Sequence, residues 1–124
     1  MSVSISEVAR PFVEGLAEGE LRYQSCADCG AAQTLAHYAC QHCGGESLAW
    51  RTSEGVGVVY AVTEVKRAPS DEYRALAPYT LVIVELDEGA RLMGHATPGV
   101  AIGQRVRAGF FEHQDRQLIR FTPI

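Results

Sequence analysis

The sequence predicts a mainly β fold in three parts: an N-terminal helical arm over residues 1–18, a cysteine-rich module over 19–50, and a β-barrel over 51–124. Three observations lead to this prediction. Apolar residues recur at helical spacing near the start, four cysteines gather between residues 26 and 43, and short β-branched runs fill the remainder. With 124 residues the chain can form one compact domain, or two small modules that share a core.

The N-terminal arm is predicted to be a short amphipathic helix. Ser4 or Ser6 could cap it, and it would run toward Glu18. Its apolar face would consist of Val8, Phe12, Val13 and Leu16. We expect Phe12, Val13 and Leu16 to dock on a partner subunit. The alternative, in which these side chains pack on the chain's own cysteine-rich module, stays open.

The cysteine-rich module contains two CxxC pairs, Cys26 with Cys29 and Cys40 with Cys43. A glycine follows each pair and can adopt positive φ, which lets backbone N–H groups point at the sulfurs. Two such knuckles supply four thiolates in a tetrahedron, the arrangement that Zn²⁺ prefers in a closed structural site. The sequence therefore predicts a rubredoxin-like zinc ribbon whose metal holds the fold together and does no chemistry.

Other interpretations of the four cysteines are less favoured. Disulfides suit secreted mini-proteins, and residues 1–10 do not resemble an export signal. A redox CxxC motif usually stands alone beside a βαβ pattern. His37 and His42 lie close by, but four cysteines already fill a tetrahedral shell. Iron stays open, because four thiolates hold iron in the same geometry.

The composition limits the location and partners of the chain. No stretch approaches the roughly 18 apolar residues of a membrane span, so we expect no membrane contact. Free cysteines without an export signal predict a cytoplasmic protein. The net charge of −4 argues against strong binding of nucleic acid. One segment is basic: Arg91, Arg105 and Arg107 occur within residues 89–111, which contain no acid. This segment could hold a small phosphorylated ligand or could be a solvated strand face.

Beyond the cysteines, β-strands are predicted at residues 47–52, 54–65, 79–86, 91–97, 105–112 and 117–122. Within 54–65, alternation would place Val58, Tyr60 and Val62 on one face. The last five strands, with tight turns after the second and fourth, predict a five-stranded OB-fold barrel. Gly55 and Gly57 would let the first barrel strand bend. A β-sandwich is the competing architecture.

The order of these parts resembles the acyl-CoA-associated family of zinc-ribbon plus OB-fold proteins, formerly a domain of unknown function. The resemblance covers nearly the whole chain. Its motifs are Gly19-Glu20-Leu21, the two CxxC-Gly knuckles, Leu48-x-Trp50, Gly55-x-Gly57-x-Val59-Tyr60, Pro78-Tyr79, Asp87-Glu88-Gly89, Arg91-Leu92-Met93-Gly94, Ile102-Gly103-x-x-Val106 and Phe121-x-Pro123. The chain departs from the pattern at residues 34–39, where relatives often have a proline pair and an arginine.

The resemblance implies a non-catalytic accessory subunit of a hetero-oligomer. Such a subunit would bind or channel a CoA thioester for a thiolase-like or hydratase enzyme of hot-dog fold. For the ligand contacts we single out cations and an aromatic ring in the long loop, namely Lys66, Arg67, Tyr73 and Arg74.

Two other functions stay open. The first is single-stranded nucleic-acid binding, with bases stacked on Tyr60, Tyr73, Phe110 or Phe111. The second is a scaffold that joins two enzymes and touches no ligand. No nucleophile elbow or phosphate-binding loop is present in the sequence.

Overall fold

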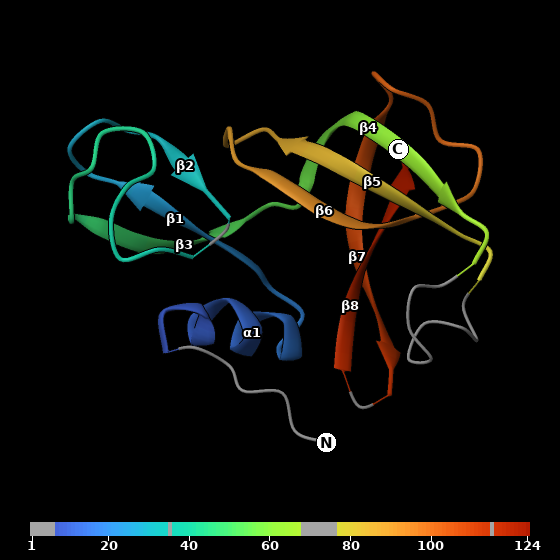
Figure 1. Cartoon of the computed structure of the whole chain (residues 1–124), viewed down its shortest axis with the longest axis horizontal. Helices are drawn as coiled ribbons and strands as arrows, with labels where there is room; N and C mark the ends of the chain where they lie inside the picture. Colours follow the sequence, from blue (N-terminus) through green and yellow to red (C-terminus); the bar gives the residue numbers. More distant parts are fainter. Residues whose placement is uncertain (1–6, 35, 68–76, 115) are drawn as a thin grey trace.

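The computed structural model describes residues 7–34, 36–67, 77–114 and 116–124. It consists of a small three-stranded sheet, a five-stranded barrel and one short helix (Figure 1). The helix contacts the first strand of the small sheet and the last strand of the barrel. No helix in the described part of the chain is long and apolar enough to cross a membrane.

Among the described residues of the N-terminal arm, only residues 10–17 are α-helical. A 3₁₀ turn, η1 (Glu7–Ala9), leads into α1 (Arg10–Ala17). The predicted caps Ser4 and Ser6 lie outside the described residues, and Ala9 occupies the cap position without a side-chain hydrogen bond. The helix ends where Gly19 takes a φ of +77°, a conformation that glycine adopts without strain.

The small sheet has the strand order β2-β1-β3 and is antiparallel throughout. Its strands are β1 (Leu21–Cys26), β2 (Ala32–Gln33) and β3 (Leu48–Ser53). The sequence between the two CxxC pairs predicts an extended piece over residues 33–39, but among the described residues of this range only Gln33 lies in a strand. The side chain of Gln24 bonds both the N–H and the carbonyl of His37, in place of a strand partner.

The barrel is closed, with the strand order β4-β5-β6-β8-β7. Its strands are β4 (Val56–Val65), β5 (Tyr79–Leu86), β6 (Arg91–Ala96), β7 (Arg105–His113) and β8 (Arg116–Pro123). The parallel pairing of β6 with β8 completes the closure. This is the topology of a five-stranded Greek-key barrel, so the predicted OB-fold is confirmed and the β-sandwich is excluded.

A bulge in β4 corrects the predicted alternation of its side chains. Val59 pairs with Val84, but the next pair is Ala61 with Ile83, so Tyr60 has no cross-strand partner. The extra residue reverses the inward and outward positions beyond it. Val62 therefore packs against the same core cluster as Val59, whereas Tyr60 is exposed.

One hydrophobic core joins the two β units. Leu21 and Tyr23 of β1 belong to the same buried cluster as Val59, Val84 and Phe121 of the barrel. A second link lies where β3 passes into β4: the carboxylate of Glu88, in the β5–β6 turn, accepts hydrogen bonds from the hydroxyl of Ser53 and the N–H of Glu54. The two units therefore pack as one body.

Candidate metal centre and ligand-binding surface

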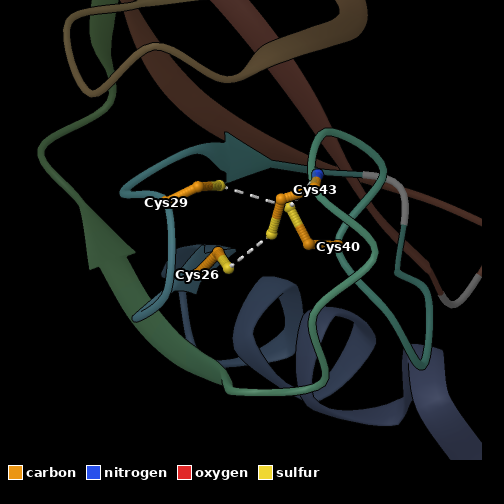
Figure 2. A group of neighbouring side chains, drawn as sticks. All are labelled: Cys26, Cys29, Cys40 and Cys43. Carbon is orange, nitrogen blue, oxygen red and sulfur yellow. Dashed lines mark hydrogen bonds between the residues drawn. The ribbon is translucent and has the colours of Figure 1, made fainter.

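The four cysteines lie on two equivalent turns that face each other across a gap (Figure 2). In each turn the N–H of the glycine after the CxxC pair donates to the carbonyl of the first cysteine, 2.9 Å from Gly30 to Cys26 and 2.9 Å from Gly44 to Cys40. Both glycines have a φ of +78°, which L side chains rarely adopt. The glycines therefore close the turns that aim the sulfurs inward.

The spacing of the four sulfurs fits a tetrahedral metal ion. All four Sγ atoms lie within 4.8 Å of one another. The Sγ atoms of Cys26 and Cys43 are 3.6 Å apart, as are those of Cys29 and Cys40. Sulfurs bound about 2.3 Å from a tetrahedral Zn²⁺ would be about 3.8 Å apart. The four cysteines thus form a zinc-ribbon site that Zn²⁺ would fit with little movement.

Backbone N–H groups point at the sulfurs, as the sequence predicted. The N–H groups of His42 and Cys43 lie 3.3 and 3.4 Å from the Sγ of Cys40, and that of Gly45 lies 3.4 Å from the Sγ of Cys43. The bond from Cys43, the one from His42 and the neighbouring thiols lower the pKa of Cys40 to about 6. This prepares Cys40 as a thiolate ligand, because the thiolate is the form that binds metal.

The pKa of Cys29 is shifted in the opposite direction, upward. Its largest single influence, a hydrogen bond from the backbone of Ala31, lowers its pKa, but desolvation and the three other thiols together raise it to about 12. Four thiols held this close cannot all ionise without a cation between them. Among the described residues the candidate metal group contains cysteines and no histidine.

Half of the predicted ligand residues fall within the described structure. Lys66 and Arg67 are exposed at the end of β4, whereas Tyr73 and Arg74 lie outside the described residues. The last pair of the β4–β5 ladder joins Val65 to Tyr79. Lys66 and Arg67 therefore follow directly after the residue that pairs with Tyr79.

The three predicted docking residues of α1 have different environments. Phe12 and Leu16 pack against the shared core cluster, while Val13 remains 36% exposed. The apolar stripe is thus used largely within the chain, as the alternative interpretation allowed. Whether Val13 and its surroundings also meet another subunit stays a prediction.

The basic segment predicted as a second phosphate site is mostly neutralised. Arg105 forms a bidentate pair with Asp87, with N–O distances of 2.7 and 3.0 Å. The guanidinium of Arg91 lies 3.5 Å from Glu85 and stacks 4.0 Å from the centre of the Tyr60 ring. Of the aromatic residues considered for base stacking, Phe110 packs toward the core and Phe111 lines a surface cavity.

That cavity was missed by sequence reasoning. It has a volume of about 280 Å³ and lies on the outside of the barrel. Tyr79, His95 and Phe111 form a chain of ring contacts in its wall, with ring centres 5.1 and 5.4 Å apart. Arg120 stacks on Phe111, its guanidinium carbon 4.2 Å from the ring centre. Burial lowers the pKa of His95, and the positive charges of Arg120 and His113 lower it further.

A second cavity adjoins the first and is mainly apolar. Its volume is about 430 Å³, and it lies between α1 and the outer face of β5, β6 and β8. The two cavities share Tyr79 and His95 as walls. The apolar side chains around the second cavity include Phe12, Leu16, Leu81, Met93 and Leu118. A signal was present in the sequence, because Tyr79, Leu81, Met93 and His95 occupy alternate, outward positions of two strands.

Two family models match consecutive parts of the chain. The rubredoxin-like zinc ribbon domain of ChsH2 matches residues 13–49, and the C-terminal OB-fold domain of ChsH2 matches residues 50–111. The two matches meet between residues 49 and 50, within β3.

Curated relatives are longer than this chain. The DUF35 domain-containing scaffold protein of Methanocaldococcus jannaschii is 33% identical over 90 residues, which cover 68% of this chain and 63% of that protein. The 3-oxo-4,17-pregnadiene-20-carboxyl-CoA hydratase alpha subunit of Mycobacterium tuberculosis is 33% identical over 116 residues, covering 90% of this chain and 36% of that protein. The chain spans less than two thirds of either relative.

A solved structure matches along almost the full length. One chain of the Ltp2-ChsH2(DUF35) aldolase superimposes with a TM-score of 0.82 at 26% identity, and the match covers 98% of both chains. The helical arm, the ribbon and the barrel are therefore all shared with that chain.

Proposed function

This chain belongs to the DUF35 family of zinc-ribbon plus OB-fold proteins that includes ChsH2, and we propose that it is a non-catalytic accessory subunit of an acyl-CoA-processing enzyme. In this role it binds or channels an acyl-CoA thioester for a thiolase-like or hydratase partner. The partner carries the chemistry, and the four cysteines hold a structural Zn²⁺. The proposal places the chain in the cytoplasm, where thiols stay reduced.

One observation carries this proposal: the chain corresponds over 98% of its length to a chain of an aldolase described by two components, Ltp2 and ChsH2. The names of the relatives support it, since one is named as the alpha subunit of a carboxyl-CoA hydratase. The match covers only 36% of that relative. The catalytic residues of the hydratase could therefore lie in the part of the relative that this chain does not match.

Affinity capture of the tagged chain from its native cell extract tests the proposal. We expect a thiolase-like or hydratase protein in near-equal molar amount, identified by mass spectrometry. Capture of nucleic acid or ribonucleoproteins without such an enzyme would favour the OB-fold as a nucleic-acid-binding module. Zinc content of the captured complex, expected at about one ion per chain, tests the metal assignment in the same sample.

A second candidate is a scaffold that touches no ligand, and the scaffold name of the archaeal relative favours it. Charge reversal of Lys66 and Arg67 to glutamate separates the two functions, because both side chains are exposed. An acyl-CoA-handling subunit should keep its partner but give a complex with weaker use of acyl-CoA. A pure scaffold should keep both assembly and activity.

A further inference from the structure

The barrel carries a polar, aromatic cavity and an apolar cavity that share Tyr79 and His95 as walls. The polar cavity lies where β5 begins and β6 ends, and Phe111 of β7 and Arg120 of β8 complete it. The apolar cavity continues from it toward α1. Together they form one bipartite surface.

The polar cavity has the chemistry of a site for a flat, anionic group. Three aromatic rings and the guanidinium of Arg120 line it, and none of its described lining residues is acidic. Arg120 is exposed, and the described residues offer it no ion pair; its contact is with the face of Phe111. A guanidinium stacked on a ring presents a plane for base stacking and N–H donors for phosphate.

Further positive charge is available at the same end of the barrel. Tyr79, which lines both cavities, is paired with Val65, and Lys66 and Arg67 follow that residue in the chain. Both are exposed. Phosphate groups leaving the polar cavity on this side would meet cations, which gives the surface the charge complementarity that a polyphosphate needs.

The apolar cavity suits the uncharged remainder of the same molecule. Its lining is dominated by leucine, methionine and aromatic side chains, and its volume of about 430 Å³ lies within the usual range for ligand sites. Met93 at its edge is 61% exposed, so a bound apolar group could cover it.

We infer that the Tyr79–His95–Phe111–Arg120 cavity binds the nucleotide end of an acyl-CoA, with the pantetheine arm and acyl group directed into the cavity walled by α1. This inference rests on the proposed function, and it adds the place on this chain where the thioester is held. We therefore expect the nucleotide end of CoA to bind this cavity even without the pantetheine arm and acyl group.

Calorimetric titration of the full chain with CoA, and separately with adenosine 3′,5′-bisphosphate, tests the nucleotide site. We expect both probes to bind, and Arg120→Gln and Phe111→Leu each to raise the Kd about tenfold, the loss expected for one charge-assisted or stacking contact. Arg51→Gln is the matched control, because Arg51 is exposed on the ribbon strand β3. Equal Kd values in all variants, or no binding at millimolar probe, would overturn the inference.

Methyl NMR of methionine-labelled chain tests the apolar half. The chain has two methionines, so the Met93 signal can be assigned with the variant Met93→Leu. A medium-chain acyl-CoA should shift this signal, and the bisphosphate alone should leave it in place. If the partner enzyme is captured but displaces CoA from the chain, this surface is a protein-docking face: the inference fails, and the accessory role stands.

Discussion

The Sγ of Cys40 receives hydrogen bonds from two backbone N–H groups of its own turn, so the residue that ionises first is decided by backbone geometry. For Cys29 a backbone hydrogen bond from Ala31 lowers the pKa, but desolvation and the three neighbouring thiols outweigh it and raise the pKa to about 12. A divalent cation removes this conflict by balancing several thiolates at once. Metal binding and the shape of the ribbon are therefore coupled.

Substitution of Cys29 by serine should abolish stable metal binding. A tetrahedral site that loses one thiolate becomes open, and structural zinc contributes about 10–16 kcal/mol in zinc-finger peptides at neutral pH. We expect zinc content near zero by elemental analysis, and a chain that unfolds or aggregates. His42→Ala is the control, because the candidate metal group consists of cysteines. A soluble Cys29→Ser protein with full zinc would show that the four-cysteine site is wrongly assigned.

Gly57 marks a position where no side chain fits. A Cβ built there would collide with the backbone carbonyl of Glu85 and lie 2.8 Å from a methyl group of Val84. Gly57→Ala should therefore lower the free energy of unfolding by about 1–3 kcal/mol, the usual cost of overpacking. A Cβ built at Gly109 would lie 3.5 Å from its nearest neighbour, the carbonyl oxygen of Arg120. Gly109→Ala should therefore change the free energy of unfolding by less than about 1 kcal/mol. Chemical denaturation measures both, and equal effects would contradict the close approach of β4 and β5.

At the scale of elements, the turn between β5 and β6 ties the barrel together. Glu88 bonds the end of β3, Asp87 pairs with Arg105 at the start of β7, and the N–H of Asp87 donates to the carbonyl of Val56. One turn thereby bonds the ribbon strand β3 and two barrel strands, β4 and β7, in addition to the two strands that it joins. The sequence predicted a tight hairpin here, but its long-range partners depend on the closed barrel.

The Asp87–Arg105 pair should make stability depend on pH. The hydrogen bond and charge of Arg105 lower the pKa of Asp87 below its ordinary value of 3.8, so the folded state favours the carboxylate. The stabilisation is present above pH 3.8 and disappears as the pH falls through the lowered pKa. Asp87→Asn should melt below the wild type at pH 7, and the difference should vanish in strong acid. Glu112→Gln, at an exposed position, is the control. A constant difference across the pH range would contradict this role.

At the scale of the whole molecule, ribbon and barrel share one core, although their sequences look like separate modules. Leu21 and Tyr23 of β1 pack with barrel residues, and α1 contacts both β1 and β8. A structural change in the ribbon would therefore alter the packing of the barrel core.

The sequence predicted much of this architecture because its signals are local. The CxxC-Gly spacing placed the metal site, and the strand patterns and turns placed the barrel. The bulge at Tyr60 was not predictable, because alternation continues in the sequence while the extra residue shows only in the pairing with β5. The cavities were missed for a similar reason: Tyr79, His95, Phe111 and Arg120 lie on four strands that become neighbours only when the barrel closes.

We propose that this chain serves an enzyme and performs no chemistry alone. The most direct test measures acyl-CoA turnover by the purified chain, by the enzyme it captures, and by the two recombined and passed over a gel-filtration column. We expect no turnover by the chain, one co-eluting complex, and more turnover by the complex than by the enzyme alone. Turnover by the isolated chain, or an enzyme that neither binds the chain nor changes its rate in its presence, would contradict the accessory role.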